Sequence, residues 1–174
     1  MRAKTEINTA ASKRGSSNGS DAIALLKADH TTVRKLFEAY EEAKEKDDGD
    51  KKSELGTQIC QQLTIHATIE EELFYPAVRE EFGGDEKDVE MLDEAEVEHS
   101  RVKVLVAEIQ EAIESNSLDG KADAKVKVLS ECVEHHVREE EDKMFPEVKK
   151  SEFDLDAIGA QLTNRKEELQ ADLA

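Results

Sequence analysis

Four histidines and two glutamates recur in this chain at a spacing that suits metal binding. His66 and Glu70 stand four residues apart, as do His136 and Glu140, and a separate histidine precedes each pair. Imidazoles combined with carboxylates form a mixed nitrogen and oxygen ligand set, which suits iron better than magnesium or calcium. The pattern therefore predicts a metal site whose ligands are His30, His66, Glu70, His99, His136 and Glu140.

The pattern occurs twice because the chain contains an internal repeat. Residues 65–76 align with residues 135–146 at an offset of 70, which matches the two His-x3-Glu pairs and also Pro76 with Pro146. Asp29-His30 aligns with Glu98-His99 at an offset of 69. We interpret the chain as two copies of a helical hairpin, each contributing one lone histidine and one His-x3-Glu pair.

Apolar residues at helical spacing place these ligands on inward faces. The rows run from Ile23 to Tyr40, from Leu55 to Phe82, from Leu92 to Ile113 and from Val126 to Met144. Each row contains one of the four histidines. A separation of four residues returns to within about 40° of the starting direction, one turn further along. Both members of a His-x3-Glu pair therefore reach the same point in the core.

These rows predict an all-α protein, an antiparallel up-down-up-down four-helix bundle with a short additional C-terminal helix within 153–169. The additional helix would pack across the bundle or help form a partner interface. Ser20 is the expected cap of the first helix, and Gly83-Gly84 is an expected break. We divide the chain into a disordered N-terminal arm, residues 1–19, and one domain, residues 20–174.

Composition narrows the classes of partner. Asp and Glu exceed Lys and Arg by 18, which argues against a nucleic-acid groove because DNA affinity depends largely on phosphate neutralisation. The sequence lacks a run of eighteen apolar residues and the apolar segment of a secretory signal. Cys60 and Cys132 do not make a disulfide framework. We therefore expect a cytoplasmic protein without a membrane or nucleic-acid partner, as a monomer or homodimer.

Other side chains are weaker ligand candidates. His135 lies about 140° from Glu140 on a helix, so we interpret it as a surface or supporting residue. Tyr40 and Glu96 are further alternatives. The acids that flank the pairs are expected on a solvated face: Glu71, Glu72, Glu139, Glu141 and Asp142.

The residues resemble the hemerythrin-like HHE cation-binding domains over about 21–170. The likeness rests on Asp29-His30, residues 65–72 with Phe74-Tyr75-Pro76, Glu98-His99, and residues 136–140 with Phe145-Pro146. This resemblance implies a non-haem di-iron centre in which two Fe ions share an oxo or hydroxo bridge. It also implies that the four histidines are terminal ligands and that Glu70 and Glu140 are bridges.

One departure from the family's oxygen carriers bears on function. Those proteins have a fifth ligand histidine one turn after the third-helix histidine, where this chain has Lys103. Their fourth helix also has a His-x4-Asp pattern, and His135 with Glu140 preserves that spacing, which leaves His135 as an alternative to His136. The remaining ligands would leave about two exchangeable positions on the irons, which suits binding of O2, peroxide or nitric oxide for sensing, carriage or stress protection. Whether the chain is an enzyme stays open at this point.

Several alternatives remain. The first is a di-iron enzyme with catalase-, peroxidase- or nitric-oxide-consuming activity. Zinc could replace iron, although these ligands exceed the four that a structural zinc usually takes. A ferritin-like iron protein needs two Glu-x-x-His motifs, and the sequence contains Glu96-x-x-His99 alone. The last alternative is an acidic helical interaction protein without metal.

Overall fold

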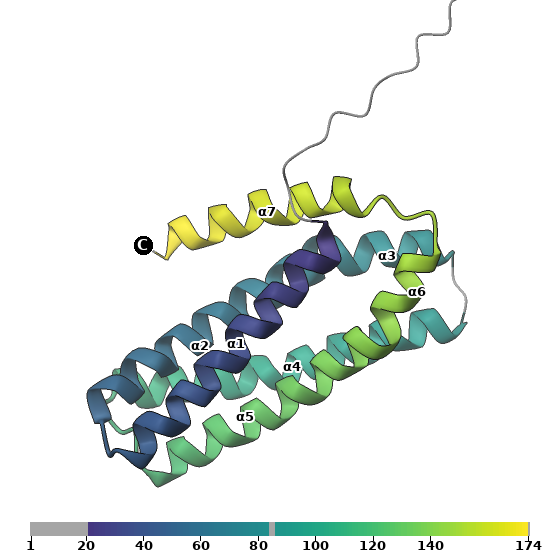
Figure 1. Cartoon of the computed structure of the whole chain (residues 1–174). Helices are drawn as coiled ribbons and strands as arrows, with labels where there is room; N and C mark the ends of the chain where they lie inside the picture. The colour runs from purple at the N-terminus through teal and green to yellow at the C-terminus, as the bar shows by residue number, and fades with distance from the viewer. Residues whose placement is uncertain (1–20, 84–85, 174) are drawn as a thin grey trace, which may run out of the picture.

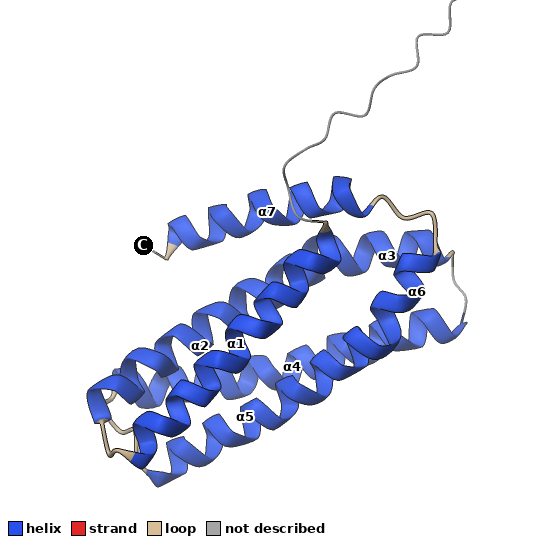
Figure 2. Cartoon of the chain, in the orientation of Figure 1, coloured by secondary structure: helices blue, strands red, loops and turns tan. Residues whose placement is uncertain are grey.

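The computed structural model describes residues 21–83 and 86–173, which form helices joined by short turns (Figure 2). The α-helices are α1 (Ala22–Glu45), α2 (Gly49–Ile69), α3 (Tyr75–Phe82), α4 (Glu86–Glu114), α5 (Gly120–Glu139), α6 (Phe145–Lys150) and α7 (Leu155–Asp172). Two π-helical segments, η1 (Glu70–Phe74) and η2 (Glu140–Met144), join α2 to α3 and α5 to α6. The described residues contain no strand, so the all-α prediction is confirmed.

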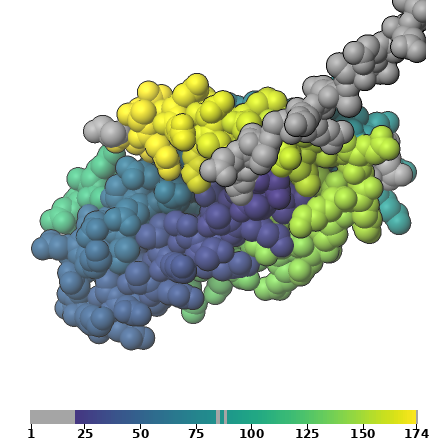
Figure 3. Space-filling model, turned by 45° about the horizontal axis from the view of Figure 1, so that its top comes forward, coloured from purple at the N-terminus to yellow at the C-terminus, as the bar shows by residue number. Residues whose placement is uncertain are grey.

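Four rods form the predicted antiparallel bundle. They are α1, the continuous α2–η1–α3 rod, α4 and the continuous α5–η2–α6 rod, and successive rods reverse direction (Figure 1). The additional C-terminal helix, α7, packs across α1, α2 and η1 (Figures 1 and 3). The predicted arm, residues 1–19, lies outside the described residues. Within the described part of the chain, no helix combines the length and apolarity needed to cross a membrane.

Aspartates determine where helices begin. The side chains of Asp21, Asp48, Asp119 and Asp154 each accept a backbone N–H in the first turn of α1, α2, α5 and α7. This arrangement satisfies donors that the helix itself leaves unpaired. The cap of α1 is therefore Asp21, and the expected cap, Ser20, lies outside the described residues. The predicted break after α3 is confirmed at Gly83, whose φ of 62° suits glycine.

The apolar core is divided into two clusters by polar residues. One cluster, which includes Phe37, Ile59 and Leu129, fills the end of the bundle near the α1–α2 turn. The other, which includes Leu26, Phe74 and Leu162, fills the end covered by α7. The buried polar side chains between the clusters include the six predicted ligands. The fold thus places those side chains in the middle of the bundle.

A second buried polar network links three helices near the α1–α2 turn. The Tyr40 hydroxyl donates to Asp123 Oδ1 at 2.9 Å, and Lys52 Nζ lies 2.8 Å from the same oxygen. Lys52 also donates to the carbonyl of Leu118 at 3.2 Å. Asp123 therefore provides the counter-charge for a lysine that is only 7% exposed.

We predict that Asp123→Ala lowers the free energy of unfolding by about 2–4 kcal/mol, because it leaves a buried ammonium without its counter-charge and a phenol without its acceptor. Urea denaturation followed by circular dichroism measures the loss. Asp93→Ala is the control, because Asp93 is 63% exposed in its side chain and its ion pair with Arg79 lies at the surface. Equal losses in the two variants would contradict a structural role for the network.

Candidate metal centre

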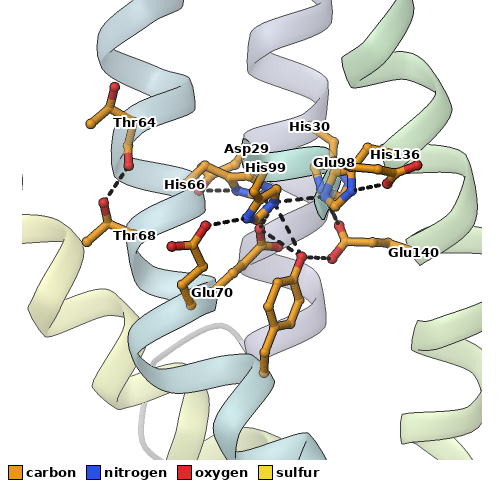
Figure 4. A network of polar contacts seen from close by, with 12 residues as sticks. Asp29, His30, Thr64, His66, Thr68, Glu70, Glu98, His99, His136 and Glu140 are labelled. Atoms are coloured by element: carbon orange, nitrogen blue, oxygen red, sulfur yellow. Dashed lines mark hydrogen bonds and ion pairs between the residues drawn. The ribbon is translucent and has the colours of Figure 1, made fainter. Parts of the chain in front are cut away.

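The structure brings all six predicted ligands together at the centre of the bundle (Figure 4). His30 comes from α1, His66 from α2, His99 from α4 and His136 from α5, while Glu70 and Glu140 begin η1 and η2. None of the six is more than 8% exposed. Their ligand atoms form two groups in which every atom lies within 4.8 Å of the others: His30, His66, Glu70 and Glu140, and Glu70, His99 and His136.

Each glutamate lies between histidines of the two groups. Glu70 Oε2 is 3.2 Å from His66 Nε2 and 3.4 Å from His99 Nε2. Glu140 Oε2 is 3.2 Å from His30 Nε2 and 3.6 Å from His136 Nε2. Each carboxylate therefore faces one histidine from each side of the cluster.

Several of these atoms have no hydrogen-bond partner among the described residues. They are His30 Nε2, His66 Nε2, Glu70 Oε1 and Glu140 Oε2, all in the same small volume. Three of them lie 3.2 Å from a carboxylate oxygen or an imidazole nitrogen of the cluster, but a buried polar atom without a hydrogen bond still costs free energy, and a buried charge costs more. A cation would satisfy all four at once. The donor set thus fits metal, and its four nitrogens and two carboxylates fit iron.

A carboxylate lies behind each histidine, on the ring nitrogen that faces away from the centre. The Nδ1 atoms of His30, His99 and His136 lie 2.9, 2.9 and 2.8 Å from Glu141, Glu71 and Glu98. His66 Nδ1 lies 3.6 Å from Asp29 Oδ2. A carboxylate in this place fixes the ring and makes the inward nitrogen a better metal ligand.

Comparison with known proteins identifies the family and the fold. The model of the hemerythrin HHE cation binding domain family matches residues 21–148, most of the chain. The chain belongs to this family. A crystal structure of a hemerythrin HHE cation binding domain-containing protein from Mycobacterium kansasii has a TM-score of 0.70, covering 88% of this chain and 89% of that one. At 24% identity, that likeness shows the fold alone.

One curated relative is longer than this chain. A DNA nickase from Nostoc sp. (strain PCC 7120 / SAG 25.82 / UTEX 2576) is 35% identical over 126 residues. The match covers 72% of this chain and 32% of the relative. The chain therefore spans about a third of that protein, and the name of the relative describes the longer protein.

The two π-helical segments of this HHE domain begin at the candidate bridging glutamates. In each segment the backbone N–H of residue i+5 donates to the glutamate carbonyl, from Tyr75 to Glu70 and from Phe145 to Glu140. Pro76 and Pro146 follow directly, and a proline removes one N–H and crowds the carbonyl four residues earlier in an α-helix. A wider turn relieves this crowding, and such turns are frequent at functional sites.

The π turns bring Tyr75 and Phe145 beside the six candidate ligands, which we did not predict from the sequence. The Tyr75 hydroxyl donates to Glu140 Oε1 at 2.9 Å and lies 3.4 Å from both Glu70 Oε2 and His99 Nε2. Phe145, its counterpart in the repeat, stacks on His30 with the ring centroids 5.9 Å apart. In an α-helix, residue i+5 points about 140° away from residue i, so α-helical spacing hides this contact.

Electrostatics favour charged carboxylate–imidazole pairs in the absence of a cation. Burial lowers the pKa of His136, but Glu140 and Glu98 more than offset this effect and raise the pKa to about 9. His30 shows the same balance, with burial opposed by Glu140, Glu70 and Glu141 and a pKa above its usual value. Burial raises the pKa of Glu140, yet His136 and His30 hold it well below the usual range. A metal cation could replace the protons on these rings.

The acids behind the histidines correct one expectation. Glu71 and Glu141 were expected on a solvated face, but their side chains are 29% and 23% exposed and bond His99 and His30. They belong to the surroundings of the candidate metal centre. The sequence carries a signal for them, because each directly follows a candidate bridging glutamate at the repeat offset.

The alternative ligands lie elsewhere. His135 is 62% exposed in its side chain and pairs with Glu98 at 3.2 Å. The Glu96 side chain is 51% exposed and pairs with Arg79. The Tyr40 hydroxyl donates to Asp123 in the second buried polar network, near the α1–α2 turn. None of the three belongs to either group of candidate ligands. We therefore do not retain them in the ligand set that we propose.

A small cavity adjoins the histidines on the side opposite the π turns. It encloses about 20 Å³ and, besides the histidine rings, its walls are largely aliphatic, including Val33, Leu63, Val102, Val133 and Val137. A cavity of this volume accommodates about one molecule of the size of water. The candidate ligands therefore border a space about the size of one water molecule.

We predict that Tyr75→Phe lowers the stability of the metal-free protein by about 1–3 kcal/mol, because it removes a hydrogen bond to the buried Glu140 carboxylate. Burial and the charges of Glu140 and Glu70 raise the pKa of Tyr75 well above its usual value, so the phenol retains the proton that it donates. Chemical denaturation of both proteins after chelator treatment measures the difference. A variant as stable as the wild type would contradict the stabilising role of this contact.

Proposed function

We propose that this chain is a non-haem di-iron protein that binds small ligands such as O2, peroxide or nitric oxide. The observation that carries the proposal is the pair of adjacent His/Glu groups that share Glu70. In this arrangement His30 and His66 would hold one iron, His99 and His136 would hold the other, and Glu70 and Glu140 would bridge them. Bound iron would supply reversible ligand binding and electron transfer.

Iron is favoured over zinc by the number and type of donors. Structural zinc usually takes four ligands in a closed tetrahedral site, whereas six donors from four rods converge here. Zinc remains the alternative metal that metal analysis would detect.

The surroundings suit binding of a small ligand. The aliphatic cavity beside the histidines has room for a molecule the size of water. Lys103, at the position where the oxygen carriers have a fifth histidine, lies 2.5 Å from Glu71 Oε2 and so is engaged by the carboxylate behind His99. An open coordination position is typical of reactive rather than structural metal sites. Sensing, carriage and stress protection all fit these features.

A di-iron enzyme that consumes peroxide or nitric oxide is the second candidate, favoured by the absence of a fifth histidine at Lys103. Turnover distinguishes the two functions. An enzyme should consume peroxide or nitric oxide faster than an equal amount of free iron, whereas a carrier or sensor should bind the ligand reversibly without consuming it.

The partner and location expectations stay predictions. The acidic excess of 18 still argues against nucleic-acid binding by this chain, although the Nostoc relative is named a DNA nickase. A cytoplasmic location and a monomeric or homodimeric state are likewise proposals.

Metal content is the first test. We predict about two irons per chain in protein from iron-supplemented cells, with ligand-to-iron absorption bands in the near ultraviolet. Glu70→Ala and His136→Ala should lose both the iron and the bands, because each removes a donor from the buried cluster. Glu96→Ala is the control, since the Glu96 side chain is 51% exposed and pairs with Arg79 rather than with any group at the cluster. A wild type without iron, or equal iron loss in the control, would refute the assignment.

The carboxylates behind the histidines provide a further test. We predict that Glu71→Gln weakens iron binding by about 10–100-fold, because the acceptor that fixes His99 loses its charge. Glu72→Gln should bind iron like the wild type, since Glu72 is 46% exposed and pairs with Arg165 instead. Competition with a coloured Fe(II) chelator under anaerobic conditions measures both affinities. Similar affinities in the two variants would refute the role of Glu71.

A further inference from the structure

Each carboxylate behind a histidine has a second, basic partner on its outer side. Glu71 contacts Lys103 Nζ at 2.5 Å, Glu141 contacts Arg34 Nη1 at 3.5 Å, and Glu98 contacts His135 Nε2 at 3.2 Å. Asp29, behind His66, is paired with Lys166. The two lysines and the arginine compensate carboxylates that are partly or largely removed from water.

Lys166 differs from the others in its origin. It comes from α7, whereas Arg34, Lys103 and His135 lie within residues 21–148, the part that matches the HHE family. α7 lies along α1 and α2 in the space-filling view (Figure 3) and buries Leu162 in the core. The Lys166 side chain is 20% exposed and that of Asp29 is 7% exposed, so their contact is largely shielded from solvent.

The Asp29–His66 pair is also looser than its three counterparts. Its atoms are 3.6 Å apart, against 2.8–2.9 Å in the other pairs. Neither Asp29 Oδ2 nor His66 Nδ1 has a hydrogen-bond partner among the described residues. Asp29 aligns with Glu98 in the repeat, and its side chain is one methylene shorter. A hydrogen bond from its histidine therefore does not hold Asp29 in place, which leaves Lys166 as its main partner.

We infer that Lys166 is a positioning residue of the metal centre, which holds Asp29 beside His66 and so makes α7 part of the site. The inference rests on the proposed function, because it assigns Lys166 an effect on the metal bound by His66. Without Lys166, the buried Asp29 carboxylate lacks its counter-charge and leaves its place behind the ring. His66 then loses the group that orients it, while the three other histidines keep theirs.

Release of iron to a chelator tests this inference. Protein loaded anaerobically with Fe(II) is mixed with excess coloured chelator, and the two irons are followed as separate kinetic phases. In Lys166→Gln, one phase should become about 10–100-fold faster and the other should stay unchanged. Lys166→Arg should restore the slow phase at least in part, because it retains the charge.

Arg165→Gln is the control for docking of α7. Arg165 precedes Lys166 and bonds Glu72 through Nε and Nη2 at 2.7 and 3.2 Å, so this variant removes another ion pair between α7 and the bundle without touching Asp29. It should release iron like the wild type. Equal acceleration in both variants would mean that α7 serves only as a cover, and would overturn the inference.

Other outcomes are equally decisive. Unchanged kinetics in Lys166→Gln, or faster release of both irons to the same extent, would overturn the inference while the di-iron proposal stands. A wild type that binds no iron would overturn the proposed function and this inference with it.

If circular dichroism shows that Lys166→Gln is unfolded, the double variant Asp29→Asn with Lys166→Gln removes both charges of the pair. This double variant should show the same selective acceleration, and its absence would overturn the inference.

Discussion

The structure depends on the burial of two carboxylates among four imidazoles at the centre of a helical core. Glu70 and Glu140 are 0% and 1% exposed, in a position where unpaired charges would destabilise the protein by several kcal/mol. Compensation comes from histidines on four rods, and so all four must present one side chain at the same level of the bundle. The division of the apolar core into two clusters follows from this requirement. A bound cation would complete the compensation that the side chains begin.

The internal repeat meets this requirement because the same local structural motif occurs in both hairpins. Each hairpin contributes an inward histidine, a His-x3-Glu pair and a π turn that ends just before proline. The π turn changes the helical phase, so residues on both sides of it face the core. Ile69, Glu70, Phe74 and Tyr75 are all buried although no single α-helical stripe contains them. A regular helix would have turned part of this set toward solvent.

Much of the fold and the inner cluster could be predicted from sequence because both depend on α-helical phase. The apolar rows place His30, His66, His99 and His136 on inward faces, and phase alone separates His136 from the adjacent, exposed His135. Predictions from α-helical phase do not hold where the helix becomes π-helical, so the sequence did not predict the contacts of Tyr75. They also failed for Glu71 and Glu141, whose side chains are long enough to reach rings on neighbouring rods. From the sequence, Lys103 indicated only that a fifth histidine ligand is absent. The structure shows that Lys103 pairs with Glu71.

The two halves of the site share their design but have diverged in the residues around it. Near His99 the repeat places the phenol of Tyr75, whereas near His30 it places the apolar ring of Phe145. Behind His136 stands Glu98 at hydrogen-bonding distance, whereas behind His66 stands the shorter Asp29, which Lys166 holds. A pair of metal ions bound here would therefore occupy unequal environments, one with a hydrogen-bond donor and well-fixed rings, the other with an apolar wall and a more loosely supported ring. Such inequality would give the two proposed ions different affinities and different preferences for a small ligand, although each would have two histidines and both would share the carboxylates.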